Sequence, residues 1–232
     1  MRLHFIEHAP CDGGAGVEEW AAGKGLDLGR TRLHAGEPLP SPRDYDALVV
    51  LGGPMAVGQS SKYPWLGPEM EHIAKAMAQG RHVLGLGLGA QLMARALGAS
   101  VGRARTPEVG WLPVRLTPYA ACMRYLAEFP RELIVLQRHQ DTFELPRHAV
   151  LLAESESCPQ AFALGEQILG LQFHLEATRD SLKRTISDAG TGLGAIIPGP
   201  TVQDAETIIR LADEHLPTLN RLCRSLCDRF FR

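Results

Sequence analysis

The segment HVLGLGLGAQLMARALG, residues 82–98, constrains the fold of this chain more than any other. Its first five residues form a mostly apolar run that predicts a buried strand, and residues 90–97 have the spacing of a helix. Glycines at positions 85, 87 and 89 predict a tight turn between the two elements. A strand that runs through a glycine turn into a helix is typical of parallel α/β sheets. The function depends on whether this turn binds a dinucleotide phosphate or presents the position of a nucleophile.

The first hundred residues alternate between predicted strands and predicted helices, which indicates a parallel sheet with helices on both faces. The strands are expected at 2–8, 46–51 and 82–86, and the helices at 16–24, between Trp65 and Gly80, and at 90–97. Four further strands, typical of antiparallel hairpins, are expected at 108–117, 133–136, 149–152 and 167–173. The predicted fold class is therefore α/β, an open and mostly parallel sheet with an antiparallel extension.

The C-terminal region is predicted to form two closing helices, at 201–213 and 217–230. Thr201 is expected to cap the first helix, and Pro217 suits the first turn of the second. The Gly- and Pro-rich segment 190–200 is expected to be a linker without chemistry. We therefore expect one domain over residues 1–200, with the helices of residues 201–232 packing on the same domain.

Composition excludes several classes of protein. A formal net charge of −2 over 232 residues gives no reason to expect nucleic acid or a membrane surface as a partner. The chain has no run of about 18 uncharged apolar residues, and its first eight residues lack the apolar core of a signal peptide. We expect a cytoplasmic protein.

The five cysteines are scattered and include no CxxC pair, so neither a disulfide framework nor a zinc ribbon is expected. Cys223 and Cys227 lie four residues apart on a predicted helix, with His215 nearby. Packing is favoured for these three residues over a metal site. We expect no metal and no cofactor.

The glycine turn has two interpretations. In the first, Gly85, Gly87 and Ala90 match the dinucleotide pattern G-x-G-x-x-G/A, with Glu108 available to a ribose. That fingerprint normally opens its fold, however, and Glu108 does not end a second buried strand. In the second, Gly85 and Gly89 are the small residues that flank the apex of a nucleophile elbow, and Gly87 is the apex.

Several motifs in order along the chain support the second interpretation. They are Gly52-Gly53-Pro54 after a strand, the turn with Gln91 four residues beyond its apex, Arg138-His-Gln-Asp141, and Gln172-Phe-His-Leu-Glu176. Over residues 40–178 the chain resembles the class I glutamine amidotransferases, whose turn reads G-x-C-x-G-x-Q. Glu108-Val-Gly-Trp111 and Ser157-Cys-Pro-Gln-Ala-Phe162 resemble the stand-alone branch similar to the glutaminase domain of GMP synthase.

The resemblance implies a flavodoxin-like fold and a site at the carboxyl ends of its strands. It places Gly87 at the position of the nucleophilic cysteine and assigns catalytic roles to His174 and Glu176. It assigns oxyanion contacts to the backbone of Gly53 and Leu88, and substrate contacts to Gln91, His139 and Asp141. It implies glutamine or a related small amide as ligand, and an acceptor enzyme as a partner for the ammonia released.

Gly87 offers no nucleophile, so we expect the fold to survive and efficient glutamine hydrolysis to be lost. Cys158 lies far from the turn in the sequence and is not expected to replace the missing thiol. Gly87 is interpreted as natural rather than introduced. The alternative function, from a different class, is a non-enzymatic or regulatory module that binds glutamine or a related carboxamide.

Overall fold

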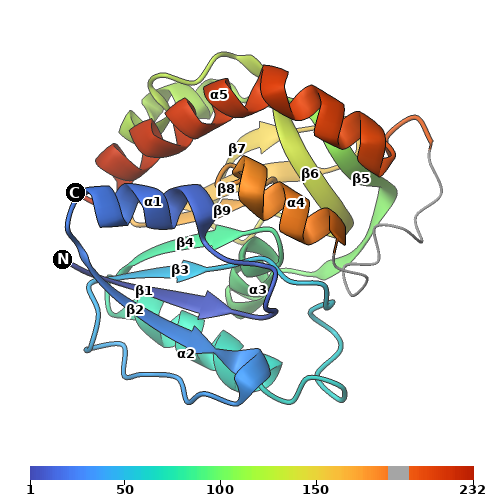
Figure 1. Cartoon of the computed structure of the whole chain (residues 1–232). Helices are drawn as coiled ribbons and strands as arrows, with labels where there is room; N and C mark the ends of the chain where they lie inside the picture. The colour runs from blue at the N-terminus through green and yellow to red at the C-terminus, as the bar shows by residue number, and fades with distance from the viewer. Residues whose placement is uncertain (188–198) are drawn as a thin grey trace.

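The computed structural model describes residues 1–187 and 199–232, which form a nine-stranded sheet covered by helices (Figure 1). The strands are β1 (Arg2–Glu7), β2 (Asp27–Arg32), β3 (Ala47–Val50), β4 (His82–Leu86), β5 (Val101–Leu116), β6 (Glu132–Phe143), β7 (Val150–Glu154), β8 (Pro159–Leu164) and β9 (Ile168–Leu171). The helices are α1 (Ala15–Gly23), α2 (Leu66–Ala78), α3 (Leu88–Ala96), α4 (Arg179–Ser187) and α5 (Ala205–Phe230). Most of the predicted linker at 190–200 lies outside the described residues.

The order of strands in the sheet is β2-β1-β3-β4-β9-β8-β7-β5-β6. The pairs from β2 to β9 are parallel, and those from β9 to β6 are antiparallel. The predicted mostly parallel α/β sheet with an antiparallel extension is therefore confirmed. Because β1, β3, β4 and β9 run the same way, the loops at their carboxyl ends meet at one edge of the sheet.

Each face of the sheet carries its own core. On β3, Ala47 and Val49 belong to the core shared with α1, α4 and α5, whereas Leu48 and Val50 belong to the core shared with α2 and α3. This alternation follows from the two-residue period of a strand, and a strand covered on both faces reads as a continuous apolar run. Figure 1 shows α1, α4 and α5 together on one side of the sheet and α2 on the other.

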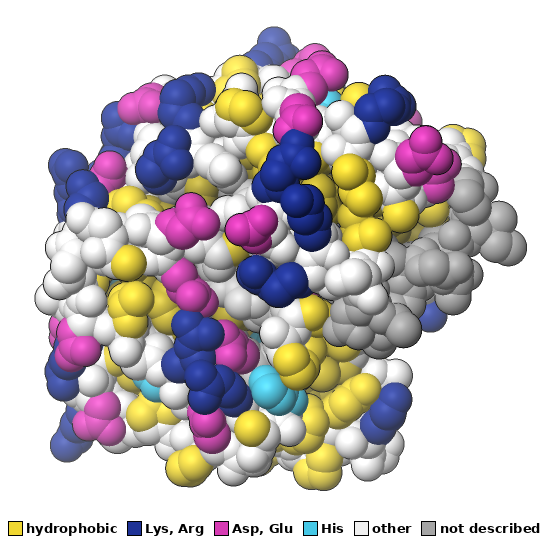
Figure 2. All heavy atoms as spheres, in the orientation of Figure 1, with side chains coloured by type: hydrophobic (Ala, Val, Ile, Leu, Met, Phe, Trp, Pro, Cys, Tyr) yellow, Lys and Arg dark blue, Asp and Glu magenta, His cyan; other side chains and the backbone are white. Residues whose placement is uncertain are grey.

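The visible surface mixes charges of both signs. In Figure 2, Lys and Arg side chains lie among Asp and Glu side chains, and no large patch of one sign forms on this face. Within the described residues, no helix combines the length and the apolar character that a membrane span requires.

The structure corrects the prediction of two closing helices. α5 is one helix with Pro217 inside it, although an interior proline removes a hydrogen bond and costs about 3 kcal/mol. Asp204 is the N-cap in place of Thr201, and its carboxylate accepts a hydrogen bond from the Thr207 amide at 2.7 Å. The buried stripe of the helix packs on the sheet and holds it together past the proline; it includes Leu219, Leu222, Leu226 and Phe230.

Three elements of the structure have no counterpart in the sequence prediction, and each has a physical reason. β2 is an edge strand in which only Thr31 is buried, so its sequence shows no apolar run. α4 buries only Leu182, so it lacks an apolar stripe. β8 opens with Pro159, a residue more typical of turns.

Candidate active site

The glycine turn connects β4 to α3, with Gly87 as the N-cap of the helix. Gly87 has φ 55° and ψ −113°, a conformation that L side chains rarely adopt. Its amide donates to the Leu171 carbonyl of β9 at 2.8 Å, and its carbonyl accepts from the Gln91 amide at 3.2 Å. These bonds tie the apex of the turn to the neighbouring strand and to the first turn of the helix.

The imidazole of His174 faces this apex. An ideal Cβ built on Gly87 would lie 3.1 Å from His174 Cε1 and 3.3 Å from His174 Nε2. The His174 amide donates to the Leu136 carbonyl at 2.8 Å, and its Nδ1 donates to Glu176 Oε1 at 2.8 Å. Glu176 thereby fixes the ring so that Nε2 is turned toward position 87, the arrangement that a nucleophile and its base require.

Two backbone amides lie beside the apex. The loop after β3 brings Gly52 and Gly53 there: a Cβ on Gly52 would lie 3.1 Å from His174 Cε1, and one on Gly53 2.9 Å from Leu88 Cδ2. Among the described residues, the amides of Gly53 and Leu88 have no hydrogen-bond acceptor. Free amides beside a helix N-terminus are suited to binding an anionic oxygen.

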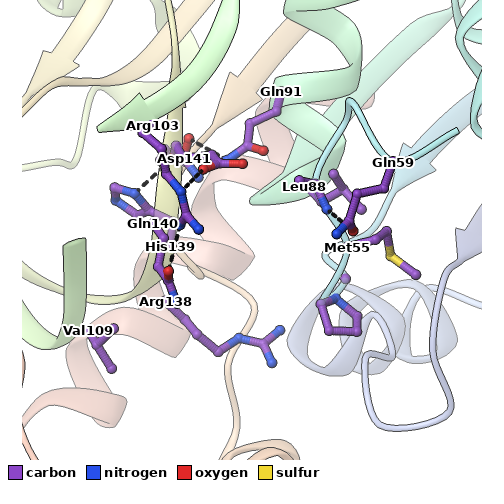
Figure 3. A pocket seen from close by; sticks show the side chains of 14 residues that line it. Met55, Gln59, Leu88, Gln91, Arg103, Val109, Arg138, His139, Gln140 and Asp141 are labelled. Carbon is purple, nitrogen blue, oxygen red and sulfur yellow. Dashed lines mark hydrogen bonds and ion pairs between the residues drawn. The ribbon is translucent and has the colours of Figure 1, made fainter. Parts of the chain in front are cut away.

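A cavity of about 230 Å³ opens beside these amides (Figure 3). Gln91 enters it from α3, and its amide nitrogen donates to the Asp141 carbonyl at 3.1 Å and to Gln172 Oε1 at 3.2 Å. Its own oxygen therefore remains available as an acceptor. The Asp141 carboxylate pairs with Arg103 at 3.5 Å, and the buried Gln172 Nε2 has no partner among the described residues. The cavity can thus offer both donors and acceptors to a small polar ligand.

The structure divides the predicted site residues between two cavities. The first is lined by Gly53, Leu88, Gln91, His139 and Asp141. His174 and Glu176 line a second cavity of about 50 Å³. Arg138, from β6, borders both cavities.

Residues 30–189 match the sequence model of the family described as glutamine amidotransferase class-I. The chain belongs to this family. It is 35% identical over 191 residues to the glutamine amidotransferase-like protein YfeJ of Salmonella typhimurium, covering 80% of each chain. The solved structure of a glutamine amidotransferase from Thermotoga maritima has a TM-score of 0.89 and 32% identity, covering 99% of this chain and 97% of that one.

Similarity to GMP synthase is also present. The glutamine-hydrolyzing GMP synthase of Aeropyrum pernix is 31% identical over 155 residues, which are 66% of this chain and 28% of that one. The resemblance drawn from the motifs is therefore confirmed at the level of the family and its flavodoxin-like fold.

The motifs read from this sequence did not include His8 and Glu69, the buried pair that supports the Gly52–Gly53 loop. His8 Nδ1 donates to the Gly52 carbonyl at 2.9 Å, and His8 Nε2 contacts Glu69 Oε1 at 2.7 Å. Both side chains are fully buried. Burial alone lowers the pKa of His8, but the Glu69 carboxylate outweighs it, so the pKa lies above its usual value.

This pair orients the loop. In a trans peptide the carbonyl and the following amide point in opposite directions. Because His8 holds the Gly52 carbonyl on its own side, the Gly53 amide is turned away from His8. His8 follows β1 and Glu69 lies on the buried side of α2, and only their contact in the fold reveals a shared role.

Glu108 belongs to a buried polar cluster that reaches the cavity of about 230 Å³ through His139. Its Oε2 accepts from Gln160 Nε2 at 2.7 Å, from Ser155 Oγ at 3.1 Å and from His139 Nε2 at 3.2 Å. Burial alone raises the pKa of Glu108, but these contacts, led by His139, hold it below its usual range. Residue Glu108 is 3% exposed, which argues against the ribose contact of the dinucleotide interpretation.

Cys158 lies in the same cluster, where Glu108, His139 and Cys158 bring possible metal ligands within 4.8 Å of one another. Gln160 Nε2 lies among them, 2.7 Å from Glu108 Oε2, 3.4 Å from His139 Nε2 and 3.5 Å from Cys158 Sγ, and thereby occupies the space between the three ligand atoms. Burial raises the pKa of the Cys158 thiol to about 11, which argues against this thiol as a replacement nucleophile.

Proposed function

We propose that this chain is a class I amidotransferase-like domain that binds glutamine or a related small amide and has lost most of its turnover. One observation carries the proposal: Gly87 stands at the apex of the turn, where a side chain would meet His174 Nε2. Around that apex lie the other parts of a glutaminase, namely the His174–Glu176 pair, the free amides of Gly53 and Leu88, and the pocket with Gln91, His139 and Asp141.

The missing group is the one that forms the covalent intermediate. A thiolate at this position would attack the side-chain amide carbon of glutamine, and His174 would pass a proton to the departing ammonia. The backbone amides would stabilise the tetrahedral oxyanion by about 3 kcal/mol per donor. Without a nucleophile, binding and oxyanion contacts leave about 10³–10⁴-fold acceleration over water. We therefore expect glutamine to bind with little hydrolysis.

The test measures ammonia release from glutamine by the unaltered protein, by Gly87→Cys and by Gly87→Ala. We expect the cysteine variant to gain turnover of at least a hundredfold, and the alanine variant to stay at the level of the unaltered protein. Alanine is the matched control because both variants add a Cβ at φ 55° and only one adds a thiol. Both should lose about 1–3 kcal/mol of unfolding free energy from backbone strain. Rapid turnover by the unaltered protein would refute the proposal.

The alternative is a non-enzymatic module that uses the same pocket to sense glutamine or a related carboxamide. It predicts saturable glutamine binding by calorimetry with no ammonia release, and no gain of turnover in Gly87→Cys. If ammonia is released, its acceptor would lie on a partner enzyme or elsewhere on this chain. Binding of a dinucleotide that glutamine does not displace would instead favour the dinucleotide interpretation.

A further inference from the structure

One stretch of chain, residues 8–16, contacts three separate parts of the candidate site. It runs from the end of β1 into the first turn of α1. His8 at its start holds the Gly52 carbonyl of the loop beside the apex. Asp12 in its middle contacts β6, and Gly16 at its end contacts the segment after β9. The 8–16 segment therefore links parts of the site that lie far apart in the sequence.

Asp12 reaches the site through Arg138. Asp12 Oδ1 accepts from Arg138 Nη2 at 2.6 Å, and the two side chains are 6% and 14% exposed. Arg138 Nη2 lies 3.7 Å from an ideal Cβ on Gly52, and the same Cβ lies 3.1 Å from His174 Cε1. Figure 3 shows the Arg138 side chain extending toward the side of the cavity on which Met55 lies. Asp12 thus fixes a guanidinium where the loop of Gly52 and the ring of His174 approach each other.

Gly16 holds the backbone of Glu176. Its amide donates to the Glu176 carbonyl at 2.8 Å, and an ideal Cβ on Gly16 would lie 3.0 Å from that oxygen. A side chain at this position would therefore displace the segment that carries His174 and Glu176. From α5, Asn220 Nδ2 donates to the Ala177 carbonyl at 2.6 Å. The first turn of α1 and the middle of α5 together hold this segment in place.

The 8–16 segment is itself held in a defined conformation. Ala15 has φ 37°, in the left-handed region that L side chains rarely adopt. Such a backbone persists only where the surrounding contacts impose it. The Gly14 amide donates to Glu18 Oε1 at 2.8 Å, which ties the segment to the first turn of α1. The segment can therefore act as a fixed reference for the parts that it contacts.

The strands alone do not place these parts of the site together. Gly52 follows β3, Arg138 lies on β6, and His174 follows β9, and β8, β7 and β5 separate β6 from β9 in the sheet. One direct bond joins β6 to the segment after β9, from the His174 amide to the Leu136 carbonyl at 2.8 Å. The 8–16 segment adds contacts to all three parts from a single piece of chain.

We propose that Asp12 and Gly16 are positioning residues, which act through Arg138 and through the Glu176 carbonyl to fix His174 relative to the glycine turn. Neither residue lines the cavity of about 230 Å³. A displacement of about 1 Å at a catalytic centre can cost about a hundredfold in turnover. The consequence for turnover rests on the proposed function, whereas the consequence for the position of His174 does not.

The first test measures distances in the full chain without ligand, as nuclear Overhauser effects from His174 Hε1 to the α protons of Gly52 and Gly87. Both effects are expected in the unaltered protein, because an ideal Cβ on either glycine, whose place an α proton takes, would lie 3.1 Å from His174 Cε1. Asp12→Asn should weaken the effect to Gly52. Gly16→Ala should weaken both, because the added methyl group displaces the segment that carries His174.

Glu7→Gln and Gly23→Ala are the matched controls. Glu7 is a buried carboxylate paired with an arginine, as Asp12 is, but it lines neither cavity beside the apex. Gly23 lies on α1, as Gly16 does, but a Cβ there meets nothing within 4 Å. Both controls should keep both effects. Unchanged effects in Asp12→Asn and Gly16→Ala overturn the proposal, and Gly16→Ala decides alone if Asp12→Asn does not fold.

The second test adds each substitution to the Gly87→Cys chain and measures ammonia release from glutamine. For Asp12→Asn and Gly16→Ala we expect kcat to fall by about ten- to a hundredfold, more than KM rises, and for Glu7→Gln and Gly23→Ala we expect no change. An unchanged kcat, or an equal loss in the controls, overturns the positioning role. If Gly87→Cys itself has no turnover, the proposed function fails, and the distances from His174 still decide the positioning.

Discussion

At the scale of single residues, His8 shows how a side chain that does not line the cavity beside Gly53 and Leu88 sets the geometry of that cavity. Its two ring nitrogens contact the Gly52 carbonyl and the Glu69 carboxylate, both of which only accept hydrogen bonds. Both nitrogens must therefore carry protons, so the ring is an imidazolium buried against a carboxylate. The raised pKa of His8 agrees with this charge state.

His8→Gln should destabilise the fold and weaken glutamine binding together. An amide can replace one of the two hydrogen bonds but not the charge, and removing one partner of a buried ion pair costs about 3–5 kcal/mol. We expect at least a tenfold loss of affinity for glutamine, measured by calorimetry, because the Gly53 amide loses its fixed orientation. Norvaline, which lacks the side-chain amide, should bind the variant and the unaltered protein equally.

The stabilisation by His8 should depend on pH. Because the folded-state pKa lies above the unfolded value of about 6.5, the contribution is complete below that value and is lost as pH rises through the folded-state pKa. The difference in unfolding free energy between the unaltered protein and His8→Gln should therefore be larger at pH 6 than at pH 9. His72→Gln is the control of opposite sign: burial lowers the pKa of His72 to about 4, below the unfolded value, so its difference should be smaller at pH 6 than at pH 9. Equal slopes for both variants would contradict the assignment.

The resemblance to the family implied Gly87, His174 and Gln91 as site residues, and the structure brings Gly87 and His174 together at the carboxyl ends of the parallel strands. Contacts between distant segments were not predictable in this way. His8 and Glu69 are 61 residues apart, and Arg138 and Asp12 are 126 apart. No local spacing links the members of either pair, so only the packed structure reveals them.

At the scale of elements, the glycines of the turn serve different purposes. Gly87 supplies the left-handed φ, whereas Gly89 lets α3 approach β3: a Cβ on Gly89 would lie 2.0 Å from the Val50 carbonyl oxygen. A Cβ on Gly85 would meet the Ala90 amide nitrogen at 2.7 Å. Helix and strand therefore pack at a distance that only glycine permits at these positions.

Gly89→Ala should destabilise the protein by about 1–3 kcal/mol or more, because the clash is with backbone that cannot rotate away. Gly67→Ala is the matched control within another helix, since a Cβ at Gly67 meets nothing within 4 Å. It should be neutral or stabilising by up to about 1 kcal/mol. Chemical denaturation of both variants measures the difference. Similar stability of the two would show that α3 can move away from β3 without cost.

Elements with strong apolar patterns were predictable, and those stabilised by tertiary context were not. β4 was predicted with its observed bounds because four of its five residues, all but His82, are buried and leave a clear apolar pattern. The sequence predicts two helices separated before Pro217, whereas α5 is one helix. Local helix propensity does not include the packing of the buried apolar residues of α5 on the sheet. The sequence of the edge strand β2 shows little apolar pattern for a related reason: only Thr31 of this strand is buried.

At the scale of the whole molecule, the sheet joins a parallel half to an antiparallel half, and the candidate site draws on both. The apex and the amides come from β3 and β4 in the parallel half, whereas His139, Asp141 and Arg138 come from β6 at the far edge of the sheet. The long β5–β6 pairing carries these residues back over the carboxyl ends of the parallel strands. The sequence predicted the parallel half and the antiparallel half of the sheet, but not that β6 of the antiparallel half reaches the carboxyl ends of the parallel strands.

The backbone conformation at position 87 makes replacement of this glycine by another residue unfavourable. Glycine relaxes a strained turn, so any side chain placed there lowers stability before the chemistry of that side chain can be of use. Proteins lie only slightly above the stability they need, so such a step is opposed unless other substitutions precede it. Once glycine stands at this apex, the stability cost disfavours its replacement by a residue with a side chain. Selection can then act on the pocket for purposes other than hydrolysis.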